Sequence, residues 1–405
     1  MKTCRVCEHP IEPFMTFGEM PVANAFINEN DFQNEYFFEL KPASCSKCST
    51  FQIVDVPKPE KMFHDHYAYF ASTSKIMTNH FRLLSEEIIK NYLRSIDPFI
   101  VEIGSNDGIS LQNYSRAGIR HLGVDPSQNV VEESRAKGVS AICTFFNKKS
   151  SEKIIDKHGK ADIIIATNTM HHIADIKKVV SGAKILLKQK GLMITEDPYL
   201  GEMIRLNSYE QIYAEHNFIW SVMSMKYLFN LYDMEIIDVI PNEHHGGCMR
   251  YYIGHKNQHR PSNRVEEYLE EEKALGLYDQ KTYEKFHHVC KTSKIEILGL
   301  LHSIKKKNKN IVGYGATAKS ATLINYCGIS RDHIDYICDT TVAKQGLFSP
   351  GAHIPVISQK DFFNNYPDYT LLFAWNHKKE ILKKEKFYTD QGGKWIEYIP
   401  KINIL

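Results

Sequence analysis

The chain has 405 residues, of which 43% are hydrophobic and 24% are charged, and its formal net charge is +2. This length is too great for one hydrophobic core and predicts two or three domains. The balanced charge provides no field that would attract nucleic acid or an anionic membrane, so we expect neither as a partner. The first residues contain no apolar core of the signal-peptide type, and the apolar runs are too short to cross a bilayer, which predicts a cytoplasmic protein.

Four of the nine cysteines form two close pairs near the start, Cys4-x2-Cys7 and Cys45-x2-Cys48. Two such turns supply the four thiolates of a tetrahedral Zn²⁺ site, and they leave no position open for water or substrate. The residues between the pairs are too few to form a stable core unaided, so a bound metal is expected to stabilise this unit. The spacing therefore predicts a structural zinc in a reducing compartment, with redox C-x-x-C chemistry as the alternative.

A segment dense in aromatic and hydroxyl side chains follows at residues 63–74, and residues 75–95 then have the apolar spacing of a helix. From residue 99 onward, apolar strands alternate with helical patterns. The strands are expected at residues 99–103, 121–127, 140–145, 161–172 and 191–200. This alternation predicts a doubly wound parallel sheet.

The first of these strands carries Glu102 and ends in the pattern E-x-G-x-x-x-G, in which Gly104 and Gly108 flank Asn106 and Asp107. Glycine lets the backbone approach a ligand closely, and the carboxyl end of such a sheet is where nucleotide-bearing cofactors bind. The spacing differs from the G-x-G-x-x-G of dinucleotide binders. It is similar to the first motif of methyltransferases that use S-adenosylmethionine (SAM). An ordinary strand-to-helix turn is the alternative.

Polar residues also follow the second and third expected strands. Asp125, in the turn Asp125-Pro126-Ser127, lies where an acid accepts hydrogen bonds from both ribose hydroxyls of a cofactor. Its alternative role is to fix the turn. Asn147, after the third strand, is a weaker candidate to face the adenine edge.

The fourth expected strand ends in a further polar group at the same edge of the sheet. Asn168 projects into the crevice there by the switch-point rule. His172, four residues on, shares its side if a helix begins at this point. We favour His172 for this role. The alternative is that one of the adjacent residues His171 and His172 is only a polar residue that starts a helix.

The last third of the chain contains a second α/β pattern. Residues 263–310 have helical spacing and predict one or two connecting helices, and further strands are expected at residues 311–315, 334–338, 369–374 and 395–398. Gly313 and Gly315 begin a G-x-G-x-x-A turn, and Asp339 follows at a strand end. Taken alone, this is a dinucleotide fingerprint, so an NAD-dependent oxidoreductase is the alternative enzyme.

The predicted fold class is therefore α/β. We expect a small N-terminal zinc-binding domain (residues 1–60) and a central Rossmann-like SAM-dependent methyltransferase domain (residues 61–255). A helical linker and a second, C-terminal α/β Rossmann-like domain complete the chain (residues 256–405).

Motifs along the whole chain agree with one family. They are the two cysteine pairs, Tyr67-x-Tyr69-x-x-Ser72-x-Ser74, the glycine turn at 102–108, Asn168-x-x-x-His172, Tyr213-x-Glu215-His216, the segment His245 to Arg250, and the segments 313–326, 344–356 and 374–376. In this set the chain resembles the sugar C-methyltransferases, which use SAM to methylate C-3 of a nucleotide-linked 4-keto-6-deoxysugar. Ala71, Asn217 and Cys248 depart from the usual family residues, which leaves the exact sugar open.

The resemblance implies a role for each catalytic candidate. The reaction needs a base at C-3 and a donor at the C-4 oxygen, because the charge delocalises onto that oxygen as an enolate. His216 is the candidate base, and Tyr213 is the alternative base or the oxyanion donor. Glu215 orients His216 or binds sugar hydroxyls. Asn168 and His172 would contact both cofactor and sugar.

The same resemblance implies which residues hold the nucleotide sugar, with thymidine as the expected nucleoside and guanosine as the alternative. Tyr67 and Tyr69 would enclose the sugar, and one of them contacts the reacting centre. The remaining candidates are Ser72, Ser74, His245, Arg250, Gly315, Lys319, Asp339 and Lys344. Arg250 is expected to pair with the diphosphate, unless it is a surface arginine at a strand start. A monomer is expected. A zinc-anchored sugar-nucleotide binding protein without turnover is the non-enzymatic alternative, and an O-methyltransferase is the other enzymatic one.

Overall fold

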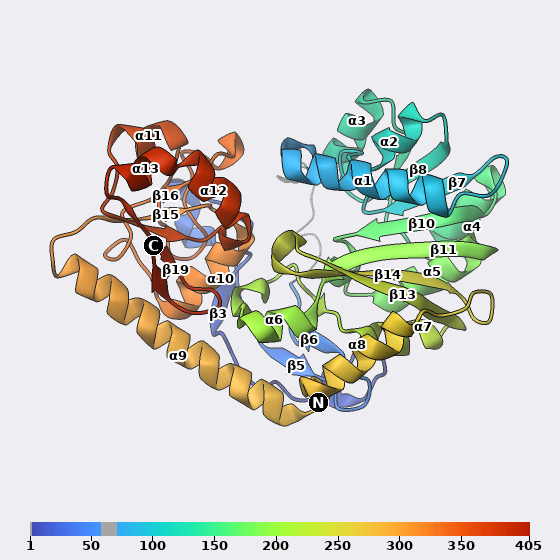
Figure 1. The fold of residues 1–405 in the computed structure, drawn as a ribbon, viewed down its shortest axis with the longest axis horizontal. Helices are drawn as coiled ribbons and strands as arrows, with labels where there is room; N and C mark the ends of the chain where they lie inside the picture. The colour runs from blue at the N-terminus through green and yellow to red at the C-terminus, as the bar shows by residue number, and fades with distance from the viewer. Residues whose placement is uncertain (1, 58–70) are drawn as a thin grey trace.

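The computed structural model describes residues 2–57 and 71–405. Figure 1 shows two α/β lobes side by side, with the long helix α9 (Gln280–Lys305) running below the C-terminal lobe on the left. The N-terminal segment lies low and between the lobes. Tyr67 and Tyr69 lie outside the described residues.

The N-terminal domain, residues 2–57, consists of short strands and one 3₁₀ helix. Its elements are β1 (Lys2–Thr3), β2 (Pro10–Ile11), β3 (Glu19–Pro21), η1 (Glu29–Asn34), β4 (Phe37–Glu39), β5 (Pro42–Ser44) and β6 (Phe51–Ile53). The β5–β6 pair gains a third strand, β12 (Phe218–Ile219), which comes from much later in the chain and runs antiparallel to β6. Strands this short need partners outside the domain to be stable.

Both lobes provide such partners. Val6 and Ala43 belong to the buried apolar cluster that also contains Trp220 of the central lobe. Phe17 meets Tyr326 of the C-terminal lobe edge to face, with ring centroids 4.8 Å apart. The N-terminal domain therefore packs against both lobes.

The central lobe is a seven-stranded sheet in the order β13-β14-β11-β10-β7-β8-β9. Its strands are β7 (Phe99–Ile103), β8 (Arg120–Asp125), β9 (Ala141–Cys143), β10 (Ala161–Thr167), β11 (Leu187–Pro198), β13 (Met234–Asn242) and β14 (Cys248–His255). Its helices are α1 (Lys75–Asn91), α2 (Leu111–Arg116), α3 (Gln128–Ala136), α4 (Lys148–His158), α5 (Ile176–Leu186), α6 (Leu200–Leu206) and α7 (Val222–Asn230). The short 3₁₀ helices are η3 (Ala71–Thr73), η4 (Met170–His172), η5 (Tyr209–Gln211) and η6 (His244–Gly246).

The helix expected at 75–95 and the five expected strands are present, with ends shifted by a few residues. The five expected strands pair in parallel, as predicted, but the sequence did not locate a hairpin that extends the sheet at one edge. β14 runs antiparallel to β11, and β13 runs antiparallel to β14. This hairpin was missed because β14 is buried along nearly its whole length and so lacks the alternation of a typical antiparallel strand.

The C-terminal lobe is a second sheet, in the order β17-β16-β15-β18-β19-β20. Its strands are β15 (Ile311–Tyr314), β16 (Ile337–Cys338), β17 (Val356–Ile357), β18 (Tyr369–Leu372), β19 (Lys394–Glu397) and β20 (Asn403–Ile404). Its helices are α10 (Ala318–Cys327), α11 (Gln359–Asn364), α12 (Lys378–Lys384) and α13 (Lys386–Asp390), with the 3₁₀ helices η7 (Val342–Lys344) and η8 (Trp375–His377). The linker expected between the lobes consists of two helices, α8 (Asn263–Ala274) and α9. The α/β prediction is confirmed for both lobes.

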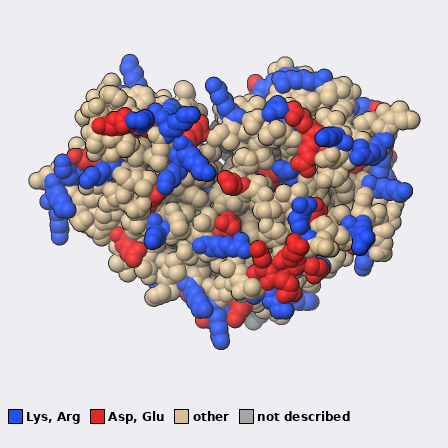
Figure 2. Space-filling view, in the orientation of Figure 1, with Lys and Arg blue, Asp and Glu red and all other residues tan. Residues whose placement is uncertain are grey.

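Figure 2 shows acidic and basic side chains interspersed over both lobes, with a notch between them at the top of this view. Within the described ranges, no helix combines the length and apolar character needed to span a membrane.

Candidate active site

The glycine turn after β7 has a backbone conformation that residues other than glycine and asparagine rarely adopt. Gly104 and Gly108 have φ values of +70° and +77°, and Asn106 between them has +48°. A Cβ at Gly104 would lie 2.4 Å from Oγ1 of Thr169, so glycine is required there for packing against the loop after β10. The turn thus brings backbone from two neighbouring strands to the carboxyl end of the sheet.

Asp125, at the end of β8, ties this turn to the next loop. Its Oδ2 accepts the N–H of Asn106 at 3.0 Å, and its Oδ1 accepts the N–H of Ser127 at 2.9 Å. Burial raises the pKa of Asp125. The turn-fixing role is therefore present, and the carboxylate still has lone pairs for ribose hydroxyls. The carbonyl oxygen of Pro126, which lies between Asp125 and Ser127, accepts a hydrogen bond from Sγ of Cys143 at 3.3 Å.

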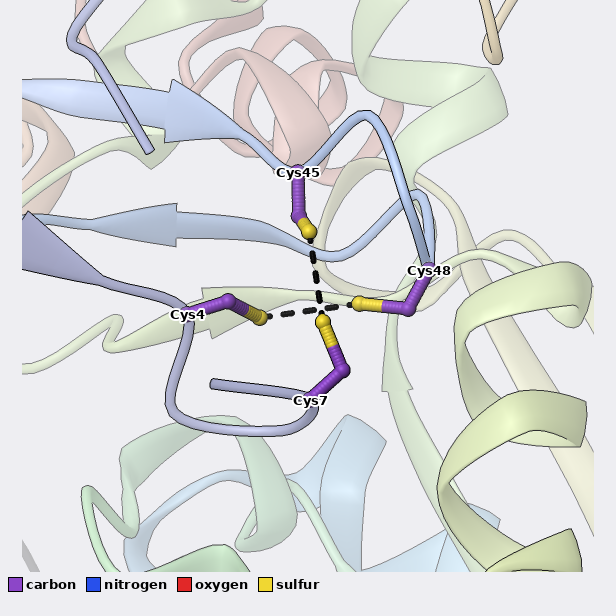
Figure 3. A group of neighbouring side chains, drawn as sticks. All are labelled: Cys4, Cys7, Cys45 and Cys48. Carbon is purple, nitrogen blue, oxygen red and sulfur yellow. Dashed lines mark hydrogen bonds between the residues drawn. The ribbon is translucent and has the colours of Figure 1, made fainter. Parts of the chain in front are cut away.

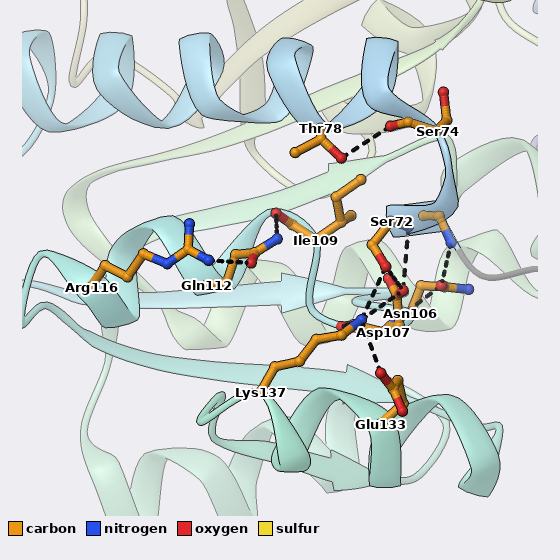
Figure 4. A network of polar contacts seen from close by, with 11 residues as sticks. Ser72, Ser74, Thr78, Asn106, Asp107, Ile109, Gln112, Arg116, Glu133 and Lys137 are labelled. Atoms are coloured by element: carbon orange, nitrogen blue, oxygen red, sulfur yellow. Dashed lines mark hydrogen bonds and ion pairs between the residues drawn. The ribbon is translucent and has the colours of Figure 1, made fainter.

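A polar network anchors the start of α1 on the glycine turn (Figure 4). Asp107, which is fully buried, accepts hydrogen bonds from the N–H and hydroxyl of Ser72, and Lys137 of α3 lies 2.9 Å from its Oδ2. Asn106 accepts the N–H of Ala71 at 3.0 Å. Through its Oδ2 atom, Asp107 thus helps to position the segment that leads into α1.

Two further candidates cap helices, and a third is buried within the sheet. Ser74 is the N-cap of α1, and its Oγ accepts the N–H of Met77 at 3.3 Å. Asn147 caps α4 in a capping box with Ser150, so its side chain is committed to a helix end rather than to an adenine edge. Glu102 is buried on β7, and burial raises the pKa of its carboxyl group.

Three histidines cluster beside this cofactor edge. His171 and His172 lie in η4, and His216 comes from the loop before β12. One nitrogen from each of the three rings lies within 4.8 Å of the others. The His171 and His216 rings meet edge to face at 4.5 Å, and the His172 and His216 centroids are 5.3 Å apart. A helix was expected to bring His172 to the side of Asn168. The chain instead makes a tight turn there, in which Asn168 has φ +53°.

Each of these rings is held by a hydrogen bond at Nδ1. His172 donates from Nδ1 to the carbonyl oxygen of Glu215 at 2.7 Å, and His216 donates to that of Gln211 at 2.6 Å. Because a carbonyl oxygen only accepts, Nδ1 carries the proton and Nε2 carries the lone pair. Burial lowers the pKa of His172 to about 3 and that of His216 well below its usual value. Both rings are neutral bases at physiological pH.

His171 has a different partner, which the sequence did not reveal. Its Nδ1 lies 2.5 Å from Oδ1 of Asp197, and its main-chain N–H donates to the same oxygen at 3.2 Å. Both side chains are buried. Burial raises the pKa of Asp197 to about 7 and lowers that of His171 to about 3. Asp197, at the end of β11, thus fixes the turn that carries two of the three imidazoles.

Tyr213 and Glu215 complete the cluster. The rings of Tyr213 and His216 lie with centroids 3.7 Å apart. Glu215 is only 5% exposed, and its Oε1 accepts a hydrogen bond from Nδ2 of Asn24 at 2.9 Å. Burial raises the pKa of Glu215, and the bond from Asn24 opposes that shift. The four-residue motif is therefore a buried loop rather than a charged helix face.

In the C-terminal lobe, the second glycine turn repeats this construction. Gly315 has φ +94°, and a Cβ there would lie 2.7 Å from that of Ala374. Asp339 accepts the N–H of Ala316 at 2.6 Å and that of Thr341 at 2.7 Å. Its carboxylate thus holds the turn together just as Asp125 does in the central lobe.

Two lysines lie at the amino end of α10. Lys344 donates to the carbonyl oxygen of Ala316 at 2.7 Å, and Lys319 donates to that of His245 at 2.5 Å. Burial lowers the pKa of both lysines. Lys319 also lies 5.1 Å from the ring centroid of Trp375. These two lysines bring positive charge to the face of the C-terminal lobe that adjoins the central lobe.

The His245-Gly246-Gly247 segment approaches protein rather than open space. A Cβ at Gly246 would lie 2.5 Å from the ring of Trp375, and one at Gly247 would lie 2.3 Å from Cγ of Glu202. Burial lowers the pKa of His245 to about 3. The close approach expected from these glycines is thus a contact between η6, η8 and α6, which joins the two lobes.

Arg250 requires a correction. It lies on β14 and donates from Nε to Oε2 of Glu196 at 2.9 Å, with its NH1 group 3.0 Å from Oε2 of Glu87. Its side chain is only 10% exposed. Glu196 also accepts a bond from His80 of α1 at 2.7 Å. Arg250 is therefore committed to two carboxylates that join α1 to the sheet, rather than to a diphosphate.

The four N-terminal cysteines converge on one point (Figure 3). The Sγ atoms of Cys4 and Cys48 are 3.5 Å apart, and those of Cys7 and Cys45 are 3.4 Å apart. A tetrahedral Zn²⁺ with Zn–S bonds of about 2.3 Å needs S···S separations of about 3.8 Å, so the geometry fits. The same separations exceed a disulfide bond of about 2.05 Å, so the four thiols are free.

Comparison with known proteins places the chain in a class and then in a family. Three family models match successive parts of it: "Putative zinc binding domain" at residues 4–63, "Methyltransferase domain" at 78–239 and "C-methyltransferase C-terminal domain" at 243–400. These matches define a SAM-dependent methyltransferase. C-methyltransferase NovU of Streptomyces niveus is 32% identical over 405 residues, which cover 99% of this chain and 96% of that protein. The chain belongs to the C-methyltransferase family.

Other similarities cover only part of the chain. The ubiquinone biosynthesis O-methyltransferase of Bartonella bacilliformis is 31% identical over 104 residues, 24% of this chain and 42% of that protein. A SAM-dependent methyltransferase from Anabaena variabilis superposes with a TM-score of 0.37 and 16% identity, covering 44% of this chain and 86% of that one.

Two residues that the sequence did not single out, Asn24 and Asp197, adjoin the predicted candidates, as does His171, the less favoured of the two adjacent histidines. Asn24 contacts Glu215, His171 packs against His216, and Asp197 holds His171. Asp197 follows Glu196 at the end of an expected strand, so the rule applied to Asp125 would have found it. Asn24 carries no such signal, because its partner Glu215 is distant in sequence.

Proposed function

We propose that this C-methyltransferase methylates C-3 of a nucleoside-diphosphate 4-keto-6-deoxysugar, with dTDP as the expected carrier and GDP as the alternative. The supporting observation is the pair of imidazoles of His172, which is half-buried, and His216, which is buried, each held at Nδ1 by a main-chain carbonyl oxygen. Methylation of carbon needs a base at that carbon, and this pair supports the proposal because histidine is the side chain that most often acts as a base near neutral pH. The full-length similarity to NovU supports carbon as the acceptor.

In the proposed mechanism His216 removes the C-3 proton with Nε2. The charge then delocalises onto the C-4 oxygen, where a hydrogen-bond donor lowers the barrier. Tyr213, which lies against His216, is the proposed donor and the alternative base. His172 contributes a second polar contact to the sugar or the cofactor. Glu215 binds sugar hydroxyls or maintains the loop that holds His216.

SAM supplies the electrophilic methyl group, and the proposed binding site is the edge formed by the glycine turn and Asp125. The positive φ values at Gly104, Asn106 and Gly108 hold this turn at the carboxyl end of the sheet, which is where nucleotide-bearing cofactors bind in such folds. Asn168, at the end of β10, adjoins the same edge. Zn²⁺ would be held by the four cysteines and would have a structural role only.

The nucleotide is proposed to bind the C-terminal lobe. The turn at Gly315, the amino end of α10 and the Lys319 and Lys344 side chains offer N–H groups and positive charge to a diphosphate. Asp339 adjoins this turn and is the proposed contact for a ribose hydroxyl. The protein is proposed to act as a cytoplasmic monomer on this small-molecule substrate.

The direct test is a mass-spectrometric assay of the purified enzyme with SAM and a panel of dTDP- and GDP-linked 4-keto-6-deoxysugars. The expected result is the gain of one methyl group on a sugar of this class. A substrate deuterated at C-3 should lose its deuterium to ordinary water during turnover. Methylation with retention of that deuterium would instead identify an O-methyltransferase. Tight binding of NADH, with none of SAM, would support the oxidoreductase alternative.

A further inference from the structure

The loop that carries Tyr213, Glu215 and His216 is partly built by the N-terminal domain. β12 follows this loop directly and is the third strand of the N-terminal sheet, where Phe218 pairs with Gln52. Ile53 donates its N–H to the carbonyl oxygen of Asn217 at 3.1 Å. The loop therefore belongs to the central lobe in sequence and to the N-terminal domain in hydrogen bonding.

The cysteine turn itself reaches this loop. Arg5, which lies between Cys4 and Cys7, donates to the carbonyl oxygen of Ile53 at 2.6 Å and to that of Asn217 at 3.5 Å. The carboxamide of Asn217 in turn donates to the carbonyl oxygen of His172 at 2.5 Å. A short chain of hydrogen bonds thus joins the cysteine cluster to the turn that carries one of the imidazoles.

A separate contact reaches a catalytic candidate directly. Asn24 lies in the loop after β3 and is exposed, yet its Nδ2 donates to Oε1 of the buried Glu215 at 2.9 Å. Phe26 in the same loop lies under the ammonium group of Lys344, with 4.7 Å from Nζ to the ring centroid. One loop of the N-terminal domain therefore contacts the imidazole cluster of the central lobe and a lysine of the C-terminal lobe.

The Asn24 side chain is the strongest of the donors that oppose the raised pKa of Glu215, and the main-chain N–H groups of Ala23 and Asn24 in the same loop act in the same direction. A buried carboxylate is costly unless donors satisfy it. A loop fixed to a zinc site provides such a donor at a defined place, whereas a donor on a free loop would lose much of its effect to conformational entropy.

We propose that the N-terminal domain completes the active site, with Asn24 as a positioning residue that holds the Glu215 carboxylate for methyl transfer. This inference rests on the proposed function for Glu215. It gives the cysteine domain a role in turnover beyond the stability of the chain. Asn24 acts through Glu215, so its loss should affect turnover and its pH dependence more than the affinity for SAM.

The test compares Asn24→Ala and Asn24→Asp with Asn28→Ala. Asn28 is a matched control because it is an exposed asparagine of the same domain whose side chain caps nothing. We expect kcat of both Asn24 variants to fall by up to about 10²-fold, with little change in SAM affinity measured by calorimetry. The contribution of Glu215 to the acid limb of kcat/KM should move up by about one pH unit, because Glu215 loses a donor to its charged form, whereas the contribution of His216 should not move. Zinc content and circular dichroism should match the wild type.

A second measurement needs no substrate. In protein labelled with ¹³C at glutamate carboxyl carbons, the Glu215 signal is assigned by its loss in Glu215→Gln, and its titration is compared between wild type and Asn24→Ala. An unchanged Glu215 titration together with unchanged kcat and pH profile in the Asn24 variants would overturn the inference. If Glu215 titrates higher in Asn24→Ala but no sugar is methylated by the wild type, the positioning contact stands and the proposed substrate fails.

Discussion

His172 and His216 are oriented in the same way: each donates its Nδ1–H to a main-chain carbonyl oxygen, that of Glu215 and that of Gln211 respectively. A main-chain carbonyl oxygen fixes a ring more rigidly than a mobile side chain does. It can only accept a hydrogen bond, so the proton stays on Nδ1 of the ring. Both rings consequently present a lone pair at Nε2. This shared orientation is the structural basis for assigning base chemistry to the cluster.

Replacing His216 with asparagine should lower kcat by ~10²- to 10⁴-fold, because the variant lacks the basic nitrogen. SAM affinity, measured by calorimetry, should be nearly unchanged, since the ring is proposed to act on the sugar. Exchange of the C-3 hydrogen with solvent, followed by mass spectrometry, should be lost in parallel. Full exchange with slow methylation would instead assign the base to another residue, with Tyr213→Phe as the next variant to measure.

The pH dependence of kcat/KM should show an unusually low acid limb for a histidine base. A base works only when unprotonated, so activity is lost as pH falls through its pKa. Burial lowers the pKa of His216 well below the usual value of about 6.5, so activity should persist below that pH. A rate profile measured over the acid range checks this. An acid limb at or above pH ~6.5 that remains in His216→Asn would contradict the assignment.

Asp197→Asn should slow turnover by about 10²-fold through misplacement of the imidazoles. Asp197 holds both the ring and the main-chain N–H of His171, and His171 packs against His216. The amide keeps the shape of the carboxylate but loses its charge. The Asp197→Asn effect should appear in kcat rather than in the KM for SAM, which steady-state kinetics separate. A kcat equal to that of the wild type would show that the His171 pair has no part in catalysis.

Lys137→Met should destabilise the protein and weaken SAM binding. The substitution leaves the buried carboxylate of Asp107 without its ion-pair partner, which lies 2.9 Å away, at a cost of about 1–3 kcal/mol in the free energy of unfolding. Denaturant unfolding and calorimetry measure the two effects. Lys149→Met is the control, because Lys149 is an exposed lysine on α4. Equal behaviour of the two variants would show that the Asp107 network is not needed to form the turn.

Metal analysis should find one zinc per chain. Cys45→Ser removes one of four thiolate ligands and should abolish stoichiometric zinc, with loss of folded N-terminal domain. The three-histidine cluster also has the residue types of a metal site. His171→Ala should nevertheless leave the zinc content unchanged, because Nε2 of His216 is proposed to take a proton from the substrate rather than to bind a metal. Two zinc ions per chain, one of which disappears in His171→Ala, would give the cluster a metal instead.

Local sequence patterns predicted much of the framework. The strands that the sequence located in both lobes are short buried apolar segments followed by segments with helical spacing. The glycine turns have positive φ values, which few residues other than glycine readily adopt. The same logic placed Asp125 and Asp339 at strand ends. The structure adds that each carboxylate holds its own glycine turn by two main-chain N–H groups, a role that position alone does not distinguish from ligand binding.

Residues whose roles depend on distant partners were predicted less well. Arg250 was expected at a diphosphate, but two carboxylates from α1 and β11 meet it on the folded sheet. Asn147 and Ser74 were expected at ligands, and both cap helices. Asn, Ser and Asp suit either role, since one side-chain oxygen accepts from a helix end or from a ligand equally well.

The sequence by itself determined the two glycine turns, the four cysteines and the order of the lobes, because each depends on residues close together in the chain. Only the tertiary structure decided that β12 completes the N-terminal sheet and that Asn24 meets Glu215, 191 residues apart in sequence. Contacts of this range arise from the packing of whole domains, and no local spacing encodes them.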